Sequence, residues 1–277
     1  YIVWGMQDWN VDPYHAFPTH ELLRQQGINV RTIAGQWAHN YPDQPDRHSE
    51  VTSGYGAEAY PNMTRFDWAV ELFPWFEYYL KGIGDEPESY VQMQRNDGRW
   101  HIEETWPPED VYGEIWEFDG FFGEWVSSTS GGFVYTFKLP GDSPIHISGL
   151  PTLHTDVSTG LCNGGQLFVT MKDGESGLRL GHATMDVRYR DGGYESKATS
   201  SLSSYRMLME FNPMDVVVSS GWLTLEFTES GEDYLPSPCA ATGLSVESFD
   251  LYLPLIDREE DHEAWFDVPP WWDQQEL

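Results

Sequence analysis

The first forty residues constrain the fold of this chain most strongly, because strand, helix and strand signals follow one another there. Residues 1–5 are a short apolar run that ends in glycine, and residues 28–33 alternate apolar and polar side chains as a strand does. Between them, Asp12-Pro13 is a helix-start signal; Pro18 shifts the start of the expected regular helix to about that residue, and Gly27 is its stop signal. The segment predicts a βαβ unit with two parallel strands and a right-handed crossover.

One acid and one histidine follow the two predicted strands. Asp8 lies in the loop after the first strand, and His39 lies in the turn after the second. We expect both side chains at one edge of the sheet, because the loops at the carboxyl ends of parallel strands form the functional crevice. An acid and a histidine in this order can be the last two members of a serine hydrolase triad. Residue types alone leave a second interpretation open, namely two unrelated surface residues.

The segments around Asp8 and His39 resemble a known hydrolase family. Residues 5–11 read Gly-Met-Gln-Asp-Trp-Asn-Val, and residues 35–39 read Gly-Gln-Trp-Ala-His. These segments are similar to the acid and histidine motifs of the Xaa-Pro dipeptidyl-peptidase family of α/β-hydrolases, which also includes cocaine esterase-like acyl esterases. The resemblance implies a serine hydrolase with Asp8 as acid and His39 as base, and it favours release of an Xaa-Pro dipeptide over hydrolysis of an acyl ester or amide. We expect neither a cofactor nor a metal ion in this site.

The nucleophile of such a triad is missing from the sequence. No Gly-x-Ser-x-Gly elbow occurs in the 277 residues, and the nearest approach, residues 174–178, falls on a predicted hairpin turn with Leu178 in place of the second glycine. Two strands with one crossover also cannot bury both faces of a parallel sheet. We therefore expect a C-terminal part of a longer hydrolase, or one piece of a two-chain assembly, whose other part precedes Tyr1 and carries the serine. The expected substrate is a peptide or an acyl ester, and a homo-oligomer is possible.

The rest of the first half predicts one helix and one further strand. Apolar residues recur at three- and four-residue spacing from Phe66 to Leu80, which predicts an amphipathic helix with one buried face that ends at Lys81-Gly82. Residues 75–82 also fit a helix motif that follows the catalytic histidine in the resembled family. Residues 90–94 alternate as a strand, and a Trp-Pro-Pro segment ends at Pro108. We place a domain boundary there: 1–108 is the C-terminal part of a hydrolase catalytic domain and 109–277 is a second domain.

The second half has the texture of an antiparallel β-sandwich. Strand-like runs recur between Gly, Pro, Asp and Ser punctuation, with no convincing helix. Residues 181–190 resemble a long strand of the same family's C-terminal jelly roll. The predicted fold class is therefore the end of an α/β-hydrolase sheet followed by a jelly-roll sandwich. Such sandwiches also serve as carbohydrate-binding or protein-binding modules, which leaves a non-catalytic role as the alternative. The expected strands are 133–139, 145–150, 152–157, 166–172, 178–190, 205–211, 222–228 and 246–253.

The charge is strongly acidic. Forty-five acidic residues against 15 basic ones give a net charge of −30, and only four of the basic residues are lysine. Repulsion of this size is screened at about 1 M salt, where the Debye length is about 3 Å. The composition predicts a protein of a salt-loving organism, in a salt-rich cytoplasm or, as we favour, outside the cell. It disfavours nucleic-acid binding, because no basic patch is present, and no apolar run is long enough to span a membrane.

Several smaller features leave alternatives open. Cys162 and Cys239 can pair in an oxidising compartment or stay as two buried thiols, and their spacing excludes a zinc cluster. Acids and histidines within 40–63 are interpreted as a solvated loop rather than a metal site. The charge run 257–263 lacks the alternating ligands of a calcium loop and is interpreted as a solvated tail. The aromatic segment 265–272 is expected to dock on a surface.

Overall fold

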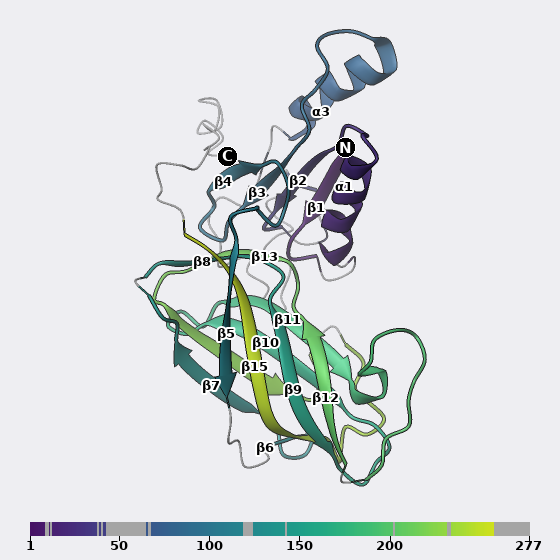
Figure 1. Ribbon diagram of the computed structural model, residues 1–277, viewed down its shortest axis with the longest axis vertical. Helices are drawn as coiled ribbons and strands as arrows, with labels where there is room; N and C mark the ends of the chain where they lie inside the picture. The colour runs from purple at the N-terminus through teal and green to yellow at the C-terminus, as the bar shows by residue number, and fades with distance from the viewer. Residues whose placement is uncertain are drawn as a thin grey trace, which may run out of the picture. The chain divides into compact units, whose positions relative to one another are not determined.

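The computed structural model describes residues 1–8, 11, 13–37, 39, 41–42, 65, 68–118, 124–141, 143–201, 203–231 and 234–257 (Figure 1). The chain divides into two compact units. Unit 1 comprises Tyr1–Asp110, Asp215–Val217 and Asp257–Leu277, and unit 2 comprises Val111–Met214 and Val218–Ile256. In the part of the chain described here, no helix is both long enough and apolar enough to cross a membrane.

Unit 1 is built on a four-stranded sheet of order β1-β2-β3-β4. Strands β1, β2 and β3 run parallel to one another, and β4 pairs with β3 in the antiparallel direction. The predicted βαβ unit is therefore confirmed, and the sheet extends it by a hairpin that turns at Gly98, whose φ is 86°. The elements are β1 (Ile2–Gly5), η1 (Pro13–His15), α1 (Ala16–Gln25), β2 (Arg31–Gly35), β3 (Tyr90–Gln94) and β4 (Trp100–Glu103).

The crossover helix α1 covers one face of this sheet. It begins at Ala16, earlier than the sequence predicts, because a proline at Pro18 still falls in the first helical turn, where backbone N–H groups have no intrahelical partner. It ends before Gly27, which adopts a φ of 70°. Its apolar side packs on the sheet to form a core cluster of Met6, Ala16, Phe17, Ala34, Val91, Met93 and Trp106. A second core cluster consists of Ile33, Trp37 and Trp100, and the partly buried side chains of Tyr1 and Val3 pack against it.

The helix that follows β2 in the described part of unit 1 corrects a prediction. Helix α3 (Trp68–Phe76) continues as a π-helical turn η2 (Glu77–Lys81) and ends at Gly82 as expected. The predicted buried face is wrong: Val70, Phe73 and Leu80 are 63%, 62% and 76% exposed. Trp75 is the buried residue of α3 in the described part of the chain, and its ring meets that of Tyr1 at 5.5 Å. The apolar spacing predicted the helix correctly, but the apolar face of a helix is buried only where another element covers it.

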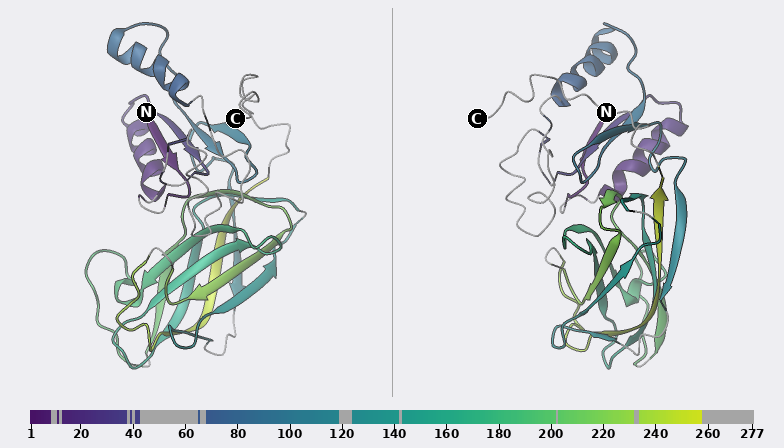
Figure 2. Two further views of the ribbon diagram at one scale, coloured as in Figure 1. Left: turned by 180° about the vertical axis from the view of Figure 1, so that it is seen from behind. Right: turned by 90° about the vertical axis from the view of Figure 1, so that its left-hand side faces the viewer.

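Unit 2 is a sandwich of two sheets, which face each other in the views of Figure 2. One sheet has the order β11-β10-β14-β7; the other has the order β12-β9-β15-β8-β13, with β5 and β6 also paired to β15. The strands are β5 (Tyr112–Phe118), β6 (Glu124–Val126), β7 (Phe133–Lys138), β8 (Ile145–Gly149), β9 (Thr152–Thr159), β10 (Gln166–Asp173), β11 (Arg179–Asp186), β12 (Ser204–Glu210), β13 (Met214–Val218), β14 (Trp222–Thr228) and β15 (Leu244–Ile256).

The core of the sandwich explains why these strands alternate. Along β9, every second side chain is buried, as at Leu153 and Val157, while side chains of the other face, such as His154 and Asp156, are partly exposed. Aromatic rings from both sheets meet in the middle: Phe227 of β14 lies 5.1 Å from Phe249 of β15. Phe118 of β5 lies 4.7 Å from the same ring. The predicted antiparallel sandwich is confirmed, and the strands β5, β6 and β13 are additions that the sequence did not reveal.

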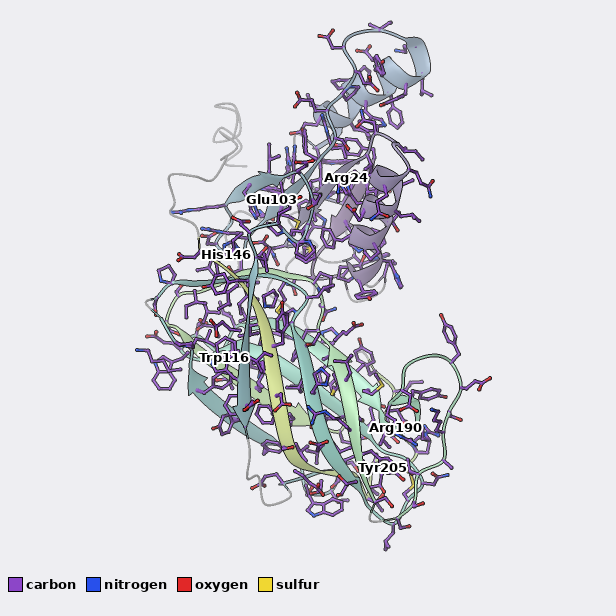
Figure 3. The ribbon with its side chains drawn as sticks, in the orientation of Figure 1. Arg24, Glu103, Trp116, His146, Arg190 and Tyr205 are labelled. Atoms are coloured by element: carbon purple, nitrogen blue, oxygen red, sulfur yellow. A yellow bond between two sulfur atoms is a disulfide. The ribbon has the colours of Figure 1, made fainter. Side chains whose placement is uncertain are left out.

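Loops at the ends of the sandwich are tied by specific contacts. Cys162 and Cys239 form a disulfide with a Cα–Cα distance of 5.7 Å, which settles the alternative that the sequence left open. Arg190 stacks on the ring of Tyr205 at 4.4 Å, and both are labelled in Figure 3. The Gly174–Gly177 segment is a turn between β10 and β11, where the Ser176 hydroxyl donates to Asp173 (2.8 Å). This serine is thus part of a turn and not of a nucleophile elbow.

Some predictions lie outside the described residues. These are the capping role of Asp12, most of the 40–63 loop with its metal alternative, most of the 257–263 charge run with its calcium alternative, and the docking of 265–272.

A candidate acid-base site

Asp8 and His39, the two site residues predicted from the sequence, are in contact. Asp8 follows β1, His39 follows β2, and the Asp8 carboxylate Oδ2 lies 3.0 Å from the His39 ring nitrogen Nδ1. The other carboxylate oxygen, Oδ1, accepts a hydrogen bond from the backbone N–H of Val11 (2.9 Å). The Asp8 side chain is 10% exposed and that of His39 is 48% exposed. The acid is thus held from two sides, and the histidine presents much of its ring at the surface of unit 1.

Backbone hydrogen bonds join the loop that carries the acid to the loop that carries the histidine. The ladder between β1 and β2 continues past the strands: Met6 N–H donates to Gly35 C=O (2.8 Å), and Gln7 N–H donates to Trp37 C=O (3.1 Å). At the end of β2 only glycine fits, because a Cβ at Gly35 would lie 2.0 Å from the Trp37 ring. These contacts explain how two residues that are far apart in sequence reach hydrogen-bonding distance.

Three buried glutamines are hydrogen-bonded to one another at the strand ends that precede the loops of this pair. Gln7 donates from its side-chain amide to the side-chain oxygen of Gln36 (2.9 Å). Gln36 in turn donates to the backbone oxygens of Gln94 (2.9 Å) and Asp215 (3.3 Å). The side-chain oxygen of Gln94 accepts from the backbone N–H of Gln36 (2.9 Å). We call these three residues the glutamine ladder; it links the carboxyl ends of β1, β2 and β3.

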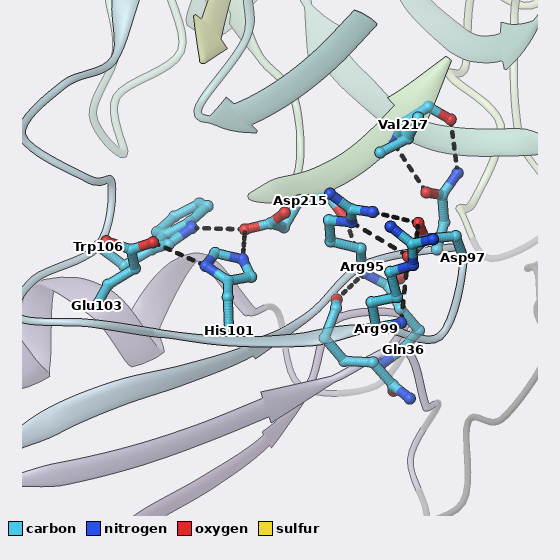
Figure 4. A network of polar contacts seen from close by, with 11 residues as sticks. Gln36, Arg95, Asp97, Arg99, His101, Glu103, Trp106, Asp215 and Val217 are labelled. Atoms are coloured by element: carbon cyan, nitrogen blue, oxygen red, sulfur yellow. Dashed lines mark hydrogen bonds and ion pairs between the residues drawn. The ribbon is translucent and has the colours of Figure 1, made fainter. Parts of the chain in front are cut away.

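A second buried network in unit 1 is centred on His101 (Figure 4). Its Nδ1 lies 2.7 Å from a Glu103 oxygen, and its Nε2 lies 2.9 Å from Asp215 Oδ2. The indole N–H of Trp106 also donates to Asp215 Oδ2 (3.4 Å). Burial lowers the pKa of His101, but the Asp215 and Glu103 carboxylates outweigh it and raise this pKa to about 10. His101 is therefore an imidazolium clamped between two carboxylates, which suits a structural role.

His182 in unit 2 has the opposite electrostatics. It is buried, and its Nε2 lies 2.9 Å from the Tyr234 hydroxyl. Burial and then the nearby positive charge of Arg179 lower the pKa of His182 to about 3, so the ring is neutral. Its ring stacks at 5.2 Å on Phe168. This histidine belongs to the packing of the sandwich.

The sequence missed the supporting residues for different reasons. His101 and Glu103 are two positions apart on β4, a spacing that places both side chains on one face of a strand, so a signal was present. Gln7 and Gln36 each lie within one of the two motifs that resemble the hydrolase family. A glutamine amide neither titrates nor acts as a nucleophile, so the residue type alone gave no sign of a role in the site. Asp215 is 114 positions from His101, and nothing local connects the two.

The fold is shared with solved hydrolase structures. The comparisons with family models and with curated proteins find no match. Among solved structures, an aminopeptidase from the marine sediment archaeon Thaumarchaeota archaeon matches at TM-score 0.60 and 13% identity, over 92% of this chain and 53% of its own. An α-amino acid ester hydrolase matches at TM-score 0.61 and 14% identity, over 92% and 55%. A CocE/NonD family hydrolase from Staphylococcus aureus matches at TM-score 0.58 and 12% identity, over 92% and 54%.

These likenesses concern the fold. The chain spans about half the length of the structures that it matches, while nearly all of it is used in each match. At identities of 12–14%, structural similarity shows a shared fold and does not show a shared activity. The chain has the fold of the C-terminal part of these hydrolases, the end of an α/β sheet followed by an antiparallel sandwich.

Proposed function

We propose that this chain is part of a serine hydrolase of the Xaa-Pro dipeptidyl-peptidase and cocaine esterase-like family. In this proposal Asp8 is the acid and His39 the base of a Ser-Asp-His triad. The observation that carries it is the 3.0 Å contact between Asp8 Oδ2 and His39 Nδ1, made by loops at the carboxyl ends of adjacent parallel strands. Acid and histidine occur there in the chain order of α/β-hydrolases.

The geometry suits general base catalysis. With Nδ1 directed at Asp8, the ring nitrogen that faces a nucleophile is Nε2. His39 would take the serine proton through Nε2 as the serine attacks the substrate carbonyl, and would return that proton to the leaving group. Asp8, fixed by the Val11 N–H, would keep the imidazole in the required tautomer and stabilise its charged form. Water would then hydrolyse the acyl-enzyme by the same proton transfers in a second cycle.

The nucleophile in this proposal belongs to a part of the hydrolase outside these 277 residues, because the sequence contains no elbow motif. Strand β1 supports the proposal: in the described sheet it pairs with β2 alone, so its other edge can receive another strand. A parallel sheet is normally buried on both faces and continued at such an edge. That additional part would also supply the backbone N–H groups of the oxyanion hole.

Helix α3 provides a second surface for the same part. Val70, Phe73, Phe76, Leu80 and Ile83 are exposed along α3, η2 and the residue after Gly82. An exposed apolar patch on a folded protein commonly marks a contact with another protein surface. We assign this face to the remaining half of the hydrolase, because the matched structures are about twice as long as the matched region.

The substrate class is a peptide with a free amino end and proline in the second position, with acyl esters as the alternative. The Asp-Trp-Asn-Val form of the acid loop favours the peptidase. The ester alternative has support of its own, since one matched structure is an α-amino acid ester hydrolase. Rates on Ala-Pro-p-nitroanilide and p-nitrophenyl butyrate separate the two, and activity on the ester alone would exclude the peptidase.

The test of the triad uses the complete hydrolase that contains these residues. Asp8→Asn and His39→Ala are expected to lower kcat by about 10⁴-fold while the protein remains folded. His154→Ala and Asp191→Asn, in unit 2, serve as matched controls and are expected to retain activity. A fluorophosphonate should label one serine of the wild-type protein. Full activity of both site variants would exclude the triad, and absence of hydrolysis and labelling in the wild type would leave a non-catalytic binding protein.

A further inference from the structure

We infer that Gln36 is a positioning residue that holds the Asp8 loop and the His39 loop in register. The inference rests on the proposed function for its catalytic meaning, but its structural content stands on the glutamine ladder alone. Gln36 contacts neither Asp8 nor His39 in the hydrogen bonds described above. It acts through the two loops, because Gln7 directly precedes Asp8 and Gln36 lies three residues before His39.

The hydrogen bonds of Gln36 use both ends of its amide. Its side-chain oxygen accepts from Gln7, and its NH₂ group donates to two backbone oxygens, those of Gln94 and Asp215. Its backbone N–H is held by the side chain of Gln94. An amide is the side chain that can accept on one side and donate twice on the other without carrying a charge. A carboxylate would face two carbonyl oxygens, and an apolar side chain would offer nothing to Gln7.

Burial makes this arrangement rigid. Gln7, Gln36 and Gln94 are all buried, and Gln36 lies in the interior of unit 1 beside the backbone of Asp215 (Figure 4). A buried amide without hydrogen-bond partners is destabilised by the full cost of its desolvation. The conformation in which these hydrogen bonds are made is therefore strongly favoured over conformations that break them. The ladder therefore fixes the separation of the two loops more firmly than the surface contact of Asp8 with His39 can do alone.

The consequence for the site is geometric. The acid must meet Nδ1, since the tautomer with the proton on Nδ1 is the one that leaves Nε2 able to accept a proton. A shift of about 1 Å between such groups can cost about 10²-fold in rate. Loss of the ladder should allow the His39 loop to move relative to the Asp8 loop, and so change the proton position on His39 without unfolding the unit.

The experiment reads the His39 ring by nitrogen NMR in the ¹⁵N-histidine-labelled chain, at a pH where the ring is neutral. In the wild type the Nδ1–H form should dominate. In Gln36→Met and in Gln7→Met it should be lost in favour of the Nε2–H form that a free histidine side chain prefers, with the larger loss in Gln36→Met. Gln92→Met is the matched control: this glutamine is also buried in β3, but its NH₂ group bonds Glu71 (2.9 Å) and Tyr90 (3.1 Å), outside the ladder.

Gln7→Met keeps the inference testable if Gln36→Met does not fold. The inference is overturned if Gln7→Met, or a folded Gln36→Met, keeps the wild-type tautomer, or if Gln92→Met changes it equally. In the complete hydrolase the same ladder variants should lower kcat by about 10²-fold with KM unchanged. Failure of the proposed function would appear differently, as a wild type without hydrolysis, and would leave the NMR result intact.

Discussion

Replacing His101 by leucine should destabilise unit 1 strongly and change how its stability depends on pH. His101 lies between Glu103 and Asp215, with ring nitrogen to oxygen distances of 2.7 and 2.9 Å, and all three side chains are buried. Removing one partner of a buried ionic group typically costs about 3–5 kcal/mol. The pKa gives a similar figure: the interval from 6.5 to about 10, at about 1.4 kcal/mol per unit, is on the order of 5 kcal/mol.

The pH dependence has a definite sign. The folded state keeps the His101 proton up to about pH 10, whereas the unfolded state releases it near pH 6.5. The stabilisation is therefore fully present below about pH 6.5 and is lost as pH rises, by about 1.4 kcal/mol per unit. The wild type should lose about 3 kcal/mol relative to His101→Leu between about pH 7 and 9.

Urea unfolding followed through the indole N–H signal of Trp106 measures this effect locally, since that group donates to Asp215. The control is His20→Leu, which removes another buried histidine of unit 1. His20 bonds Thr32 (2.8 Å), and burial lowers its pKa, so its loss should produce no alkaline slope. A cost below about 1 kcal/mol for His101→Leu, or the same slope above pH 7 in wild type and variant, would refute the imidazolium assignment.

Three further predictions concern salt, acid and the disulfide. The melting temperature should rise between about 0.1 and 2 M NaCl, because a net charge of −30 is then screened; a constant value would contradict the salt-adapted interpretation. Unit 2 should lose stability as pH falls from 6.5 toward about 3, since its folded state excludes the His182 proton; urea midpoints should show this loss reduced in His182→Gln. Replacing Cys162 and Cys239 by serine should lower the unfolding free energy by about 4 kcal/mol, because the disulfide closes a loop of 77 positions. Identical urea unfolding curves for the wild type and this double variant would exclude a stabilising disulfide.

The sequence predicts the site where its signals are local. β1, α1 and β2 follow from periodicity, a proline and a glycine, and parallel strands then require their carboxyl ends to share an edge. This geometry predicted that Asp8 and His39 lie close together, and in the structure they are in contact. Partners such as Asp215 could not be predicted, because contact across more than a hundred positions depends on how separate elements pack. Strand β5 was missed because it is largely exposed, and the charged side chains Glu114 and Glu117 interrupt its apolar pattern.

The α3 helix shows what periodicity measures. Its apolar spacing can be read from the sequence and predicts one buried face. Burial also requires a second surface that covers this face, and the described residues do not supply one for Val70, Phe73 and Leu80. Covering a side chain of this kind is worth about 1.5–3 kcal/mol. Three of them together approach the 5–15 kcal/mol that holds an average domain folded. An apolar face of that value is costly to leave in water. The stripe on α3, and the edge of β1 that has no partner strand in the described sheet, therefore fit the proposal that this chain is part of a larger hydrolase, whose other part would supply the serine of a triad with Asp8 and His39.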